Sequence, residues 1–362
     1  MFTAADHEHM ARALRLAERG LYTTSPNPRV GCVIVSDGAV VGEGWHERAG
    51  EAHAEIHALR MAGAAAQGAT VYVTLEPCSH YGRTPPCAKA LIEAGVARVV
   101  VAMRDPNPLV SGEGITMLQL AGIRVDQGLL ESQAHELNIG FVYRMTCGRP
   151  WVRLKTAASL DGKTALANGV SQWITGEDAR RDAHRLRARS CAVLTGIGTV
   201  LADDPRMNAR SVETTRQPLR IVLDSKLAMP PTAKILKEGK TLIVTGNHDH
   251  EKMDALWNAG AQMLILPLEK GRVDLGRMLD ELVKREINEV MVEAGRTLSG
   301  AFLQAGLVDE LVIYLAPLLL GDKARSMFDL PGLSDMAGRR ELCIKDVTMV
   351  GRDMRIRAVP LE

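Results

Sequence analysis

Three potential metal ligands within residues 53–87 constrain this chain more than any other feature of its sequence. His53 is followed two residues later by Glu55, then by a strand-like segment over 69–75, and then by a polar loop that contains Cys78 and Cys87. Both cysteines follow a proline in a segment too polar for a hydrophobic core. One imidazole and two thiolates bind zinc and leave its fourth tetrahedral position open for water. The stretch therefore predicts one zinc ion per chain, held by these three side chains.

Glu55 extends this prediction from metal binding to chemistry. Zinc lowers the pKa of a bound water to about 7, from about 15.7 in bulk water, so hydroxide is available at neutral pH. Glu55 is close enough to His53 in the sequence to take that proton without being a ligand itself. The same division of roles is typical of zinc deaminases. We therefore expect Glu55 to be the catalytic acid–base and His53, Cys78 and Cys87 to be the zinc ligands.

Two other kinds of zinc protein use related patterns. His53 and His57 form an i, i+4 pair, as in metalloproteases, but those enzymes place the glutamate directly after the first histidine, where this chain has Ala54. The second alternative is not an enzyme but a module in which zinc has only a structural role. Structural zinc sites usually have four protein ligands and would not need Glu55. Metal and turnover assays on the pure protein would separate the two readings.

The spacing of the cysteines narrows the choice among deaminases. The usual pattern is Cys-x-x-Cys, whereas eight residues separate Cys78 from Cys87. Residues 26–31 (Pro-Asn-Pro-Arg-Val-Gly), 74–80 (Thr-Leu-Glu-Pro-Cys-Ser-His) and 82–87 (Gly-Arg-Thr-Pro-Pro-Cys) closely resemble motifs of the bifunctional deaminase–reductase family of riboflavin biosynthesis. The resemblance implies zinc-dependent hydrolytic deamination of 2,5-diamino-6-(5-phosphoribosylamino)pyrimidin-4(3H)-one.

The second half of the chain is similar to the reductase part of the same family. The similarity rests on Leu154-Lys155 and on segments 159–163, 196–205 and 292–295, which occur in the family's order. A strict Gly-x-Gly-x-x-Gly fingerprint is missing, although small-residue loops at 195–199 and 294–300 follow apolar strands and could cradle a phosphate. The resemblance implies a dihydrofolate-reductase-like fold that uses NADPH. It also implies reduction of the ribosyl side chain of 5-amino-6-(5-phosphoribosylamino)uracil to ribityl.

The resemblance also assigns ligand contacts residue by residue. The residues expected to meet NADPH are Ala157, Trp173, Thr199, Asp203, Ser225, Gly295, Arg296, Thr297, Leu298, Ser299, Gly300 and Ala301. The residues expected to hold the pyrimidine substrates are Asn27, His46, His80 and Arg83 in the first half and Lys155, Ser171, Arg187, Arg206, Arg210 and Glu293 in the second. Arginines suit a sugar phosphate, because a guanidinium can bind it through two parallel hydrogen bonds. Arg187 could instead lie on a solvated helix face, and Trp173 could be a core residue.

We expect two α/β domains, because strand and helix patterns alternate on both sides of a boundary near Gly148 and Pro150. Residues 1–147 should form a cytidine-deaminase-like zinc domain and residues 148–362 the dihydrofolate-reductase-like domain. Local signals include a capped helix after Thr3, a hairpin around Asp37-Gly38 and a helix over 177–189. The His53 motif should lie in the first turn of a helix, since residues i and i+2 face different ways in a helix interior.

Composition limits the possible partners. The net charge of +1 gives no indication of a polyanion partner. The alternative is a nucleoside or tRNA deaminase fused to an unrelated reductase. Against it, the Cys-x8-Cys loop departs from the pattern of nucleic-acid deaminases, and no basic stripe is evident. The apolar run 311–320 is broken by Pro317 and is too short to span a bilayer. Six cysteines in so long a chain do not make a disulfide framework.

The remaining expectations concern the cellular setting. Cys32, Cys147, Cys191 and Cys343 are predicted to be small core residues with reduced thiols. We expect a cytoplasmic protein that acts on a small pyrimidine ribosyl phosphate, without a nucleic-acid or membrane partner. A homo-oligomer, either a dimer or a tetramer, is also expected.

Overall fold

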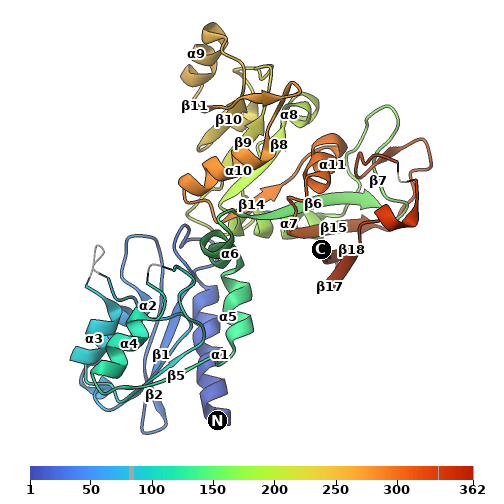
Figure 1. The fold of residues 1–362 in the computed structure, drawn as a ribbon. Coiled ribbons are helices and arrows are strands. Elements are labelled where there is room, and N and C mark those ends of the chain that lie inside the picture. Colours follow the sequence, from blue (N-terminus) through green and yellow to red (C-terminus); the bar gives the residue numbers. More distant parts are fainter. Residues whose placement is uncertain (81–84, 109, 333, 362) are drawn as a thin grey trace. The chain divides into compact units, whose positions relative to one another are not determined.

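The computed structural model describes residues 1–80, 85–108, 110–332 and 334–361. The chain divides into two compact units, Met1–Gly148 and Arg149–Glu362 (Figure 1). None of the helices in the described part of the chain combines the length and the apolar character that crossing a bilayer requires.

In the described residues, the first unit is built on a five-stranded sheet of order β2-β1-β3-β4-β5. Its strands are β1 (Gly31–Ser36), β2 (Ala39–Trp45), β3 (Thr70–Val73), β4 (Arg98–Val101) and β5 (Arg124–Gln127). β1 runs antiparallel to β2 and β3, and β3, β4 and β5 run parallel. Asp37 and Gly38 have the positive φ values that the tight β1–β2 turn needs, which confirms the predicted hairpin.

Helices cover both faces of this sheet (Figure 1). They are α1 (Ala4–Glu18), α2 (Ala54–Ala62), η1 (Gly63–Ala66), α3 (Cys87–Glu93), α4 (Glu113–Leu120), α5 (Glu131–Leu137) and α6 (Ile139–Cys147). One apolar cluster joins the sheet to α2, α3 and α4, and another joins the opposite face to α1, α5 and α6. Thr3 and Asp6 form the predicted capping box at the start of α1.

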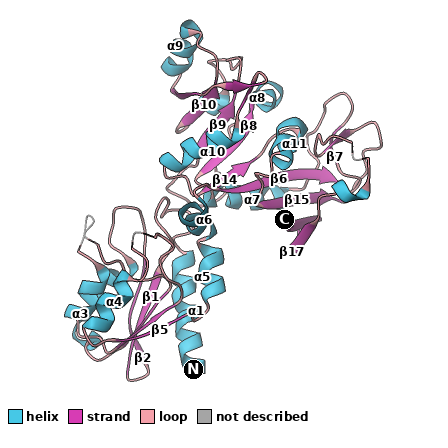
Figure 2. Cartoon of the chain, viewed as in Figure 1, coloured by secondary structure: helices cyan, strands magenta, loops and turns pink. Residues whose placement is uncertain are grey.

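In the described residues, the second unit contains a nine-stranded sheet of order β11-β10-β9-β8-β14-β6-β15-β18-β17 (Figure 2). The strands are β6 (Trp151–Ser159), β8 (Ala192–Gly196), β9 (Leu219–Leu223), β10 (Thr241–Thr245), β11 (Ala261–Ile265), β14 (Glu289–Val292), β15 (Glu310–Ala316), β17 (Leu342–Val350) and β18 (Asp353–Pro360). All neighbours are parallel except the β15–β18 and β18–β17 pairs. The carboxyl ends of the parallel strands thus share one edge, which is where open α/β sheets bind ligands.

Short helices and ribbons surround this sheet. They are β7 (Lys163–Ala165), α7 (Glu177–Arg189), α8 (Ile197–Asp203), η2 (Lys234–Leu236), α9 (His250–Asn258), β12 (Leu268–Glu269), β13 (Arg272–Val273), α10 (Leu275–Lys284), α11 (Arg296–Gln304), β16 (Arg325–Ser326) and η3 (Met336–Gly338). The helix predicted over 177–189 matches α7. One apolar cluster beneath α10 and α11 includes alternate residues of β6, β8, β9 and β14, and another lies on the opposite face.

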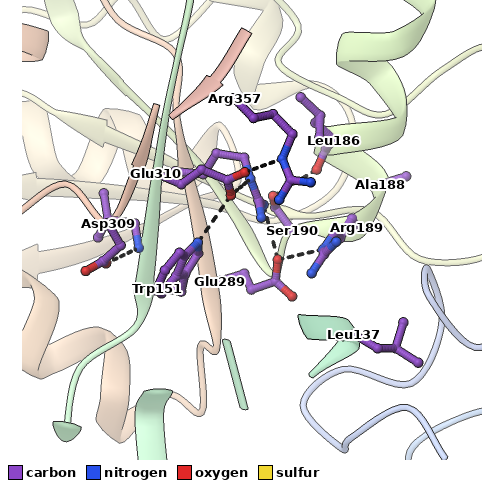
Figure 3. Close-up of polar contacts among 12 residues, drawn as sticks. Leu137, Trp151, Leu186, Ala188, Arg189, Ser190, Glu289, Asp309, Glu310 and Arg357 are labelled. Atoms are coloured by element: carbon purple, nitrogen blue, oxygen red, sulfur yellow. Dashed lines mark hydrogen bonds and ion pairs between the residues drawn. The ribbon is translucent and has the colours of Figure 1, made fainter. Parts of the chain in front are cut away.

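A buried charged cluster crosses the amino-terminal ends of β14, β6 and β15 (Figure 3). Arg153 is only 2% exposed and pairs with Glu289 at 3.2 Å and with Glu310 at 2.7 Å. Arg189 contacts Glu289, and Arg357 contacts the other oxygen of Glu310. Charged groups therefore join these strands to β18 and to the end of α7.

Two cysteine predictions are wrong. Cys32 and Cys191 are buried as expected, but Cys147 is exposed and Cys343 is only partly buried. Cys147 is the last residue of α6, and Cys343 lies on β17, the outermost strand of its sheet. A small apolar side chain does not by itself indicate a core position.

Candidate active site

The three predicted zinc ligands converge in the first unit. The Nδ1 atom of His53 lies 3.6 Å from the Sγ atom of Cys78 and 3.3 Å from that of Cys87. Tetrahedral zinc, with bonds of about 2.1 Å to nitrogen and about 2.3 Å to sulfur, would separate its ligand atoms by roughly 3.6–3.8 Å. In the described residues, these three side chains form the only such group of potential ligands, all within 4.8 Å of one another. The donor set and its spacing fit a zinc ion.

Helix ends present these ligands. His53 is the N-cap residue of α2 but makes no side-chain cap hydrogen bond, because its ring turns toward the two sulfur atoms. Cys87 is the first residue of α3, and its backbone N–H donates to the Sγ atom of Cys78 at 3.3 Å. Amides at a helix start stabilise negative charge, so they favour the thiolate form that binds metal.

While zinc is not bound, the pKa values of the two thiols are shifted in opposite directions. Hydrogen bonds from Cys87 and His53 lower the pKa of Cys78 to about 4 against the effect of burial. The pKa of Cys87 is raised, because it donates to Cys78 and is itself buried. Zinc binding requires both thiolates and would therefore release a proton from Cys87.

Glu55 lies in the first turn of α2, as predicted, and is 3% exposed. Burial, followed by the charge of Cys78, raises the pKa of Glu55 to about 7. Its Oε2 atom has no hydrogen-bond partner among the described residues. An unpaired buried oxygen next to the metal ligands fits a group that exchanges protons with a water or substrate.

Asn27 and His46 form an oriented pair beside the zinc ligands. The Nδ1 atom of His46 lies 3.1 Å from the carbonyl oxygen of Ala52, so it carries the ring proton and donates to that carbonyl. Its Nε2 atom then accepts from the amide nitrogen of Asn27 at 3.1 Å. Burial lowers the pKa of His46, which keeps this tautomer neutral. The ring of His46 meets that of His53 edge to face at 5.3 Å.

The other two residues predicted to contact the pyrimidine are His80 and Arg83. His80 is exposed and follows Cys78 on the metal loop. Arg83 lies outside the described residues.

In the second unit, Lys155, Arg187 and Glu293 are in direct contact. Arg187 donates from Nε and Nη2 to the two oxygens of Glu293, at 2.6 and 2.9 Å, and Lys155 Nζ lies 3.6 Å from the same carboxylate. Burial alone would raise the pKa of Glu293, but Arg187 and Lys155 outweigh it and lower the pKa to about 2. Arg187 is only 14% exposed at its side chain, so it is not a solvated helix residue.

The remaining arginines lie around the same group. Asn208 accepts from Arg187 at its main-chain oxygen and from Arg210 at its side-chain oxygen. Arg206 pairs with Glu238 at 3.4 Å. Ser171 lies apart from this cluster in sequence, on the loop that precedes α7.

The predicted NADPH contacts follow the carboxyl ends of the central strands. Ala157 is in β6, Ser225 follows β9, Thr199 and Asp203 are in α8, and segment 295–301 caps and opens α11. Gly196 ends β8, and a Cβ atom there would lie 3.3 Å from a methyl group of Leu298, so the two small-residue loops meet. Trp173 is 66% exposed and lies under Arg180 at 4.6 Å, so it is not a core residue.

Comparisons with known proteins agree with this arrangement. Residues 3–103 match the cytidine and deoxycytidylate deaminase zinc-binding region, and residues 150–356 match the RibD C-terminal domain. The riboflavin biosynthesis protein RibD of Escherichia coli is 52% identical, over 98% of this chain and 99% of that protein. The chain belongs to the RibD family.

Solved structures of RibD proteins have the same fold over the full length. Acinetobacter baumannii RibD is 48% identical, with a TM-score of 0.93 over 99% of both chains. A Thermotoga maritima protein, named as a diaminohydroxyphosphoribosylaminopyrimidine deaminase/5-amino-6-(5-phosphoribosylamino)uracil reductase, is 33% identical, with a TM-score of 0.90 over 99% of both chains.

Membership of the RibD family confirms the central predictions. The fold is a cytidine-deaminase-like domain followed by a RibD C-terminal, dihydrofolate-reductase-like domain. The chain is a bifunctional deaminase and reductase of riboflavin biosynthesis, with its zinc site at His53, Cys78 and Cys87. RibD homology implies NADPH as the reductant.

Some polar residues near these sites were not identified from the sequence. His184 is buried between Arg187 and Arg210, and burial together with these charges lowers its pKa to about 4. Glu76, two residues before Cys78, is buried and binds the start of α4. Glu76 lies in the 74–80 motif, but the residues it binds are distant in the sequence. His184 and Arg187 are three residues apart on α7, and this spacing was the available signal for His184.

Proposed function

We propose that residues 1–147 deaminate 2,5-diamino-6-(5-phosphoribosylamino)pyrimidin-4(3H)-one and that residues 148–362 then reduce the ribosyl group of 5-amino-6-(5-phosphoribosylamino)uracil. The observation that carries this proposal is the convergence of His53, Cys78, Cys87 and Glu55 in the unit that precedes a RibD C-terminal domain. The names of both activities on the Thermotoga relative support the choice of substrates.

In the deaminase, Glu55 transfers the protons. Zinc, when bound, supplies the Lewis acidity that makes water nucleophilic at neutral pH. Glu55 accepts a proton from the attacking water and delivers it to a ring nitrogen. It then takes the proton of the newly added hydroxyl and passes it to the departing amine, so that the C=O bond forms, water is consumed and ammonia is released. The amide nitrogen of Asn27 is engaged by His46, which assigns its carbonyl oxygen to a hydrogen-bond donor of the pyrimidine. His80 and Arg83 are assigned to the same substrate.

In the reductase, conversion of ribosyl to ribityl opens the sugar ring, adds hydride at C1′ and a proton at the ring oxygen. NADPH, when bound, supplies the hydride, and the residues at the carboxyl ends of β6, β8, β9 and β14 would hold it. Lys155 and Glu293 are assigned to the sugar. Arg206 and Arg210 suit the phosphate, whereas Arg187 is already engaged by Glu293 and Asn208 and would mainly orient Glu293.

Assays of both half-reactions on the purified, zinc-loaded protein test this proposal. The wild type should release ammonia from the diaminopyrimidine phosphate, and NADPH oxidation should follow. Glu55→Gln should keep one zinc per chain and lose about 10²–10⁴-fold in deamination rate, because the amide cannot carry the proton. Loss of zinc together with activity would contradict the proton-transfer role, and turnover of neither substrate would refute the function.

We also propose that the chain forms a homo-oligomer through β17. The strand register shifts by one residue after Ile344, which places Leu342, Ile344, Val347 and Met349 on one face, and all four are exposed. A two-fold interface must be self-complementary, and an uncharged apolar face can pack against its own copy. Light scattering after chromatography should show a dimer or larger assembly for the wild type and a monomer for Val347→Asp, with both activities retained in the folded monomer.

The cytoplasmic location remains a prediction. It rests on the reduced cysteines and the small-molecule substrates.

A further inference from the structure

Glu76 is a buried carboxylate that the proposed reaction does not use. It is 5% exposed and follows β3, where its own N–H donates to the carbonyl of Met103 at the end of β4. This bond fixes the backbone of Glu76 at the edge of the sheet that leads into the metal loop. Cys78, a zinc ligand, is only two residues further along the chain.

The carboxylate of Glu76 binds three backbone N–H groups of a different segment. Oε2 accepts from Asp105 at 3.1 Å and from Gly112 at 2.9 Å, and Oε1 accepts from Ile115 at 3.2 Å. The N-cap residue of α4 is Gly112, which has no side chain to bind these amides. Glu76 therefore supplies the cap of α4 from a distant part of the sequence.

The approach of the two segments is too close for other side chains. A Cβ atom at Gly114 would lie 1.9 Å from the carbonyl oxygen of Pro77. A second link joins Ser79 of the metal loop to Glu113, the first residue of α4, at 3.2 Å. The start of α4 is thus packed directly on residues 76–79.

Asp105, at one end of this set of hydrogen bonds, is held by Glu76, two residues before the zinc ligand Cys78. Its side chain accepts from the N–H of Asn107 at 2.8 Å, so the turn that follows is ordered around it. The position of Glu76 therefore sets the position of Asp105 and of the turn after it relative to the metal loop.

We infer that Glu76 is a positioning residue for deamination: its carboxylate holds Asp105 and the start of α4 against residues 76–79, so that the pocket is shaped before the pyrimidine binds. The residue acts through the backbone it clamps and touches neither the zinc ligand atoms nor the reacting atoms. The inference rests on the proposed deaminase function.

The test uses the full-length, zinc-loaded protein and the variant Glu76→Gln, in which the amide can accept from fewer of the three N–H groups. We expect one zinc per chain, an increase of at least tenfold in KM for the diaminopyrimidine phosphate and a change in kcat of less than about threefold. Reduction of the deaminated substrate should be unchanged, which provides a fold control within the same molecule. Glu93→Gln, which breaks an exposed pair with Lys89 on α3 of the same unit, is the matched control and should alter KM by less than twofold.

Hydrogen–deuterium exchange gives a readout that does not depend on turnover. Amides in 105–120 should exchange at least tenfold faster in Glu76→Gln, while those of α2 keep their wild-type rates. Wild-type values of both KM and the amide exchange rates in Glu76→Gln would overturn the inference. Loss of zinc from this variant would also overturn it, because Glu76 would then support the zinc ligands themselves. If Glu76→Gln does not fold, Glu76→Asp, which keeps the charge but shortens the reach of the carboxylate, should raise KM with zinc retained. A wild-type enzyme that fails to deaminate the pyrimidine would instead refute the proposed function.

Discussion

The surroundings of each thiol separate the zinc ligands from the other cysteines. Cys78 and Cys87 lie within 3.6 Å of the His53 ring nitrogen, at the start of a helix and the loop before it. Cys32 is also buried beside Glu55, but it lies on β1, where burial and that carboxylate raise the pKa of its thiol. The pKa of the Cys87 thiol is raised as well, so closeness to the His53 ring, and not thiol acidity, distinguishes the ligands.

Cysteine substitutions test this difference. Cys78→Ala or Cys87→Ala should lose bound zinc and abolish deamination, because two protein ligands hold the ion much more weakly than three. Cys32→Ala and Cys191→Ala should keep one zinc per chain. Metal analysis of the four purified variants gives the answer, and normal zinc in either of the first two would show the ligand assignment to be wrong.

At the scale of elements, the charged cluster of Figure 3 determines how β14, β6 and β15 respond to acid. Burial alone would raise the pKa of Glu310, but Arg153 and Arg357 outweigh it and lower the pKa to about 2. The unfolded chain has a glutamate pKa of about 4.3. The stabilisation is therefore complete above that value and is lost as the pH falls toward 2.

Glu310→Gln should show this dependence in urea unfolding. At pH 7 the variant should be about 3–5 kcal/mol less stable, because Arg153 and Arg357 lose a buried counter-charge. Between pH 5 and pH 3 its midpoint should fall less than that of the wild type. Glu281→Gln, which breaks the exposed pair with Lys284, is the control and should cost less than about 0.5 kcal/mol. Equal acid sensitivity in Glu310→Gln and wild type would exclude the cluster as the source.

The number of residues between two interacting side chains decides which contacts could be predicted from the sequence. The capping box at Thr3, the Asp37-Gly38 turn and the start of α2 at the His53 motif depend on residues a few positions apart, and each was predicted. Glu76 with segment 105–115 and Arg153 with Glu310 join distant positions. A single sequence contains no signal for such pairs, since any glutamate could serve.

At the scale of the whole molecule, each set of chemically active residues belongs to one compact unit. His53, Glu55, Cys78 and Cys87 lie in Met1–Gly148, and Lys155, Arg187 and Glu293 lie in Arg149–Glu362. Inter-domain linkers with glycine and proline are crossed by few contacts. The two half-reactions should therefore be separable.

Removal of zinc tests this separation. Chelated protein should still oxidise NADPH when given the already deaminated substrate, and its circular dichroism should remain that of the folded chain. In the opposite direction, Lys155→Ala should deaminate normally and form no ribityl product. Absorbance at the NADPH band is the measurement. If oxidation stopped on chelation while the fold was intact, the account of two independent sites would fail.

The place of β18 in its sheet has a consequence for synthesis on the ribosome. β15 lies between β6 and β18, so this strand is paired on both sides only when residues 353–360 have emerged. The first unit is made entirely of earlier residues and can fold while translation continues. A stalled or prematurely terminated chain would therefore carry a finished deaminase beside a reductase whose β15 edge is still open.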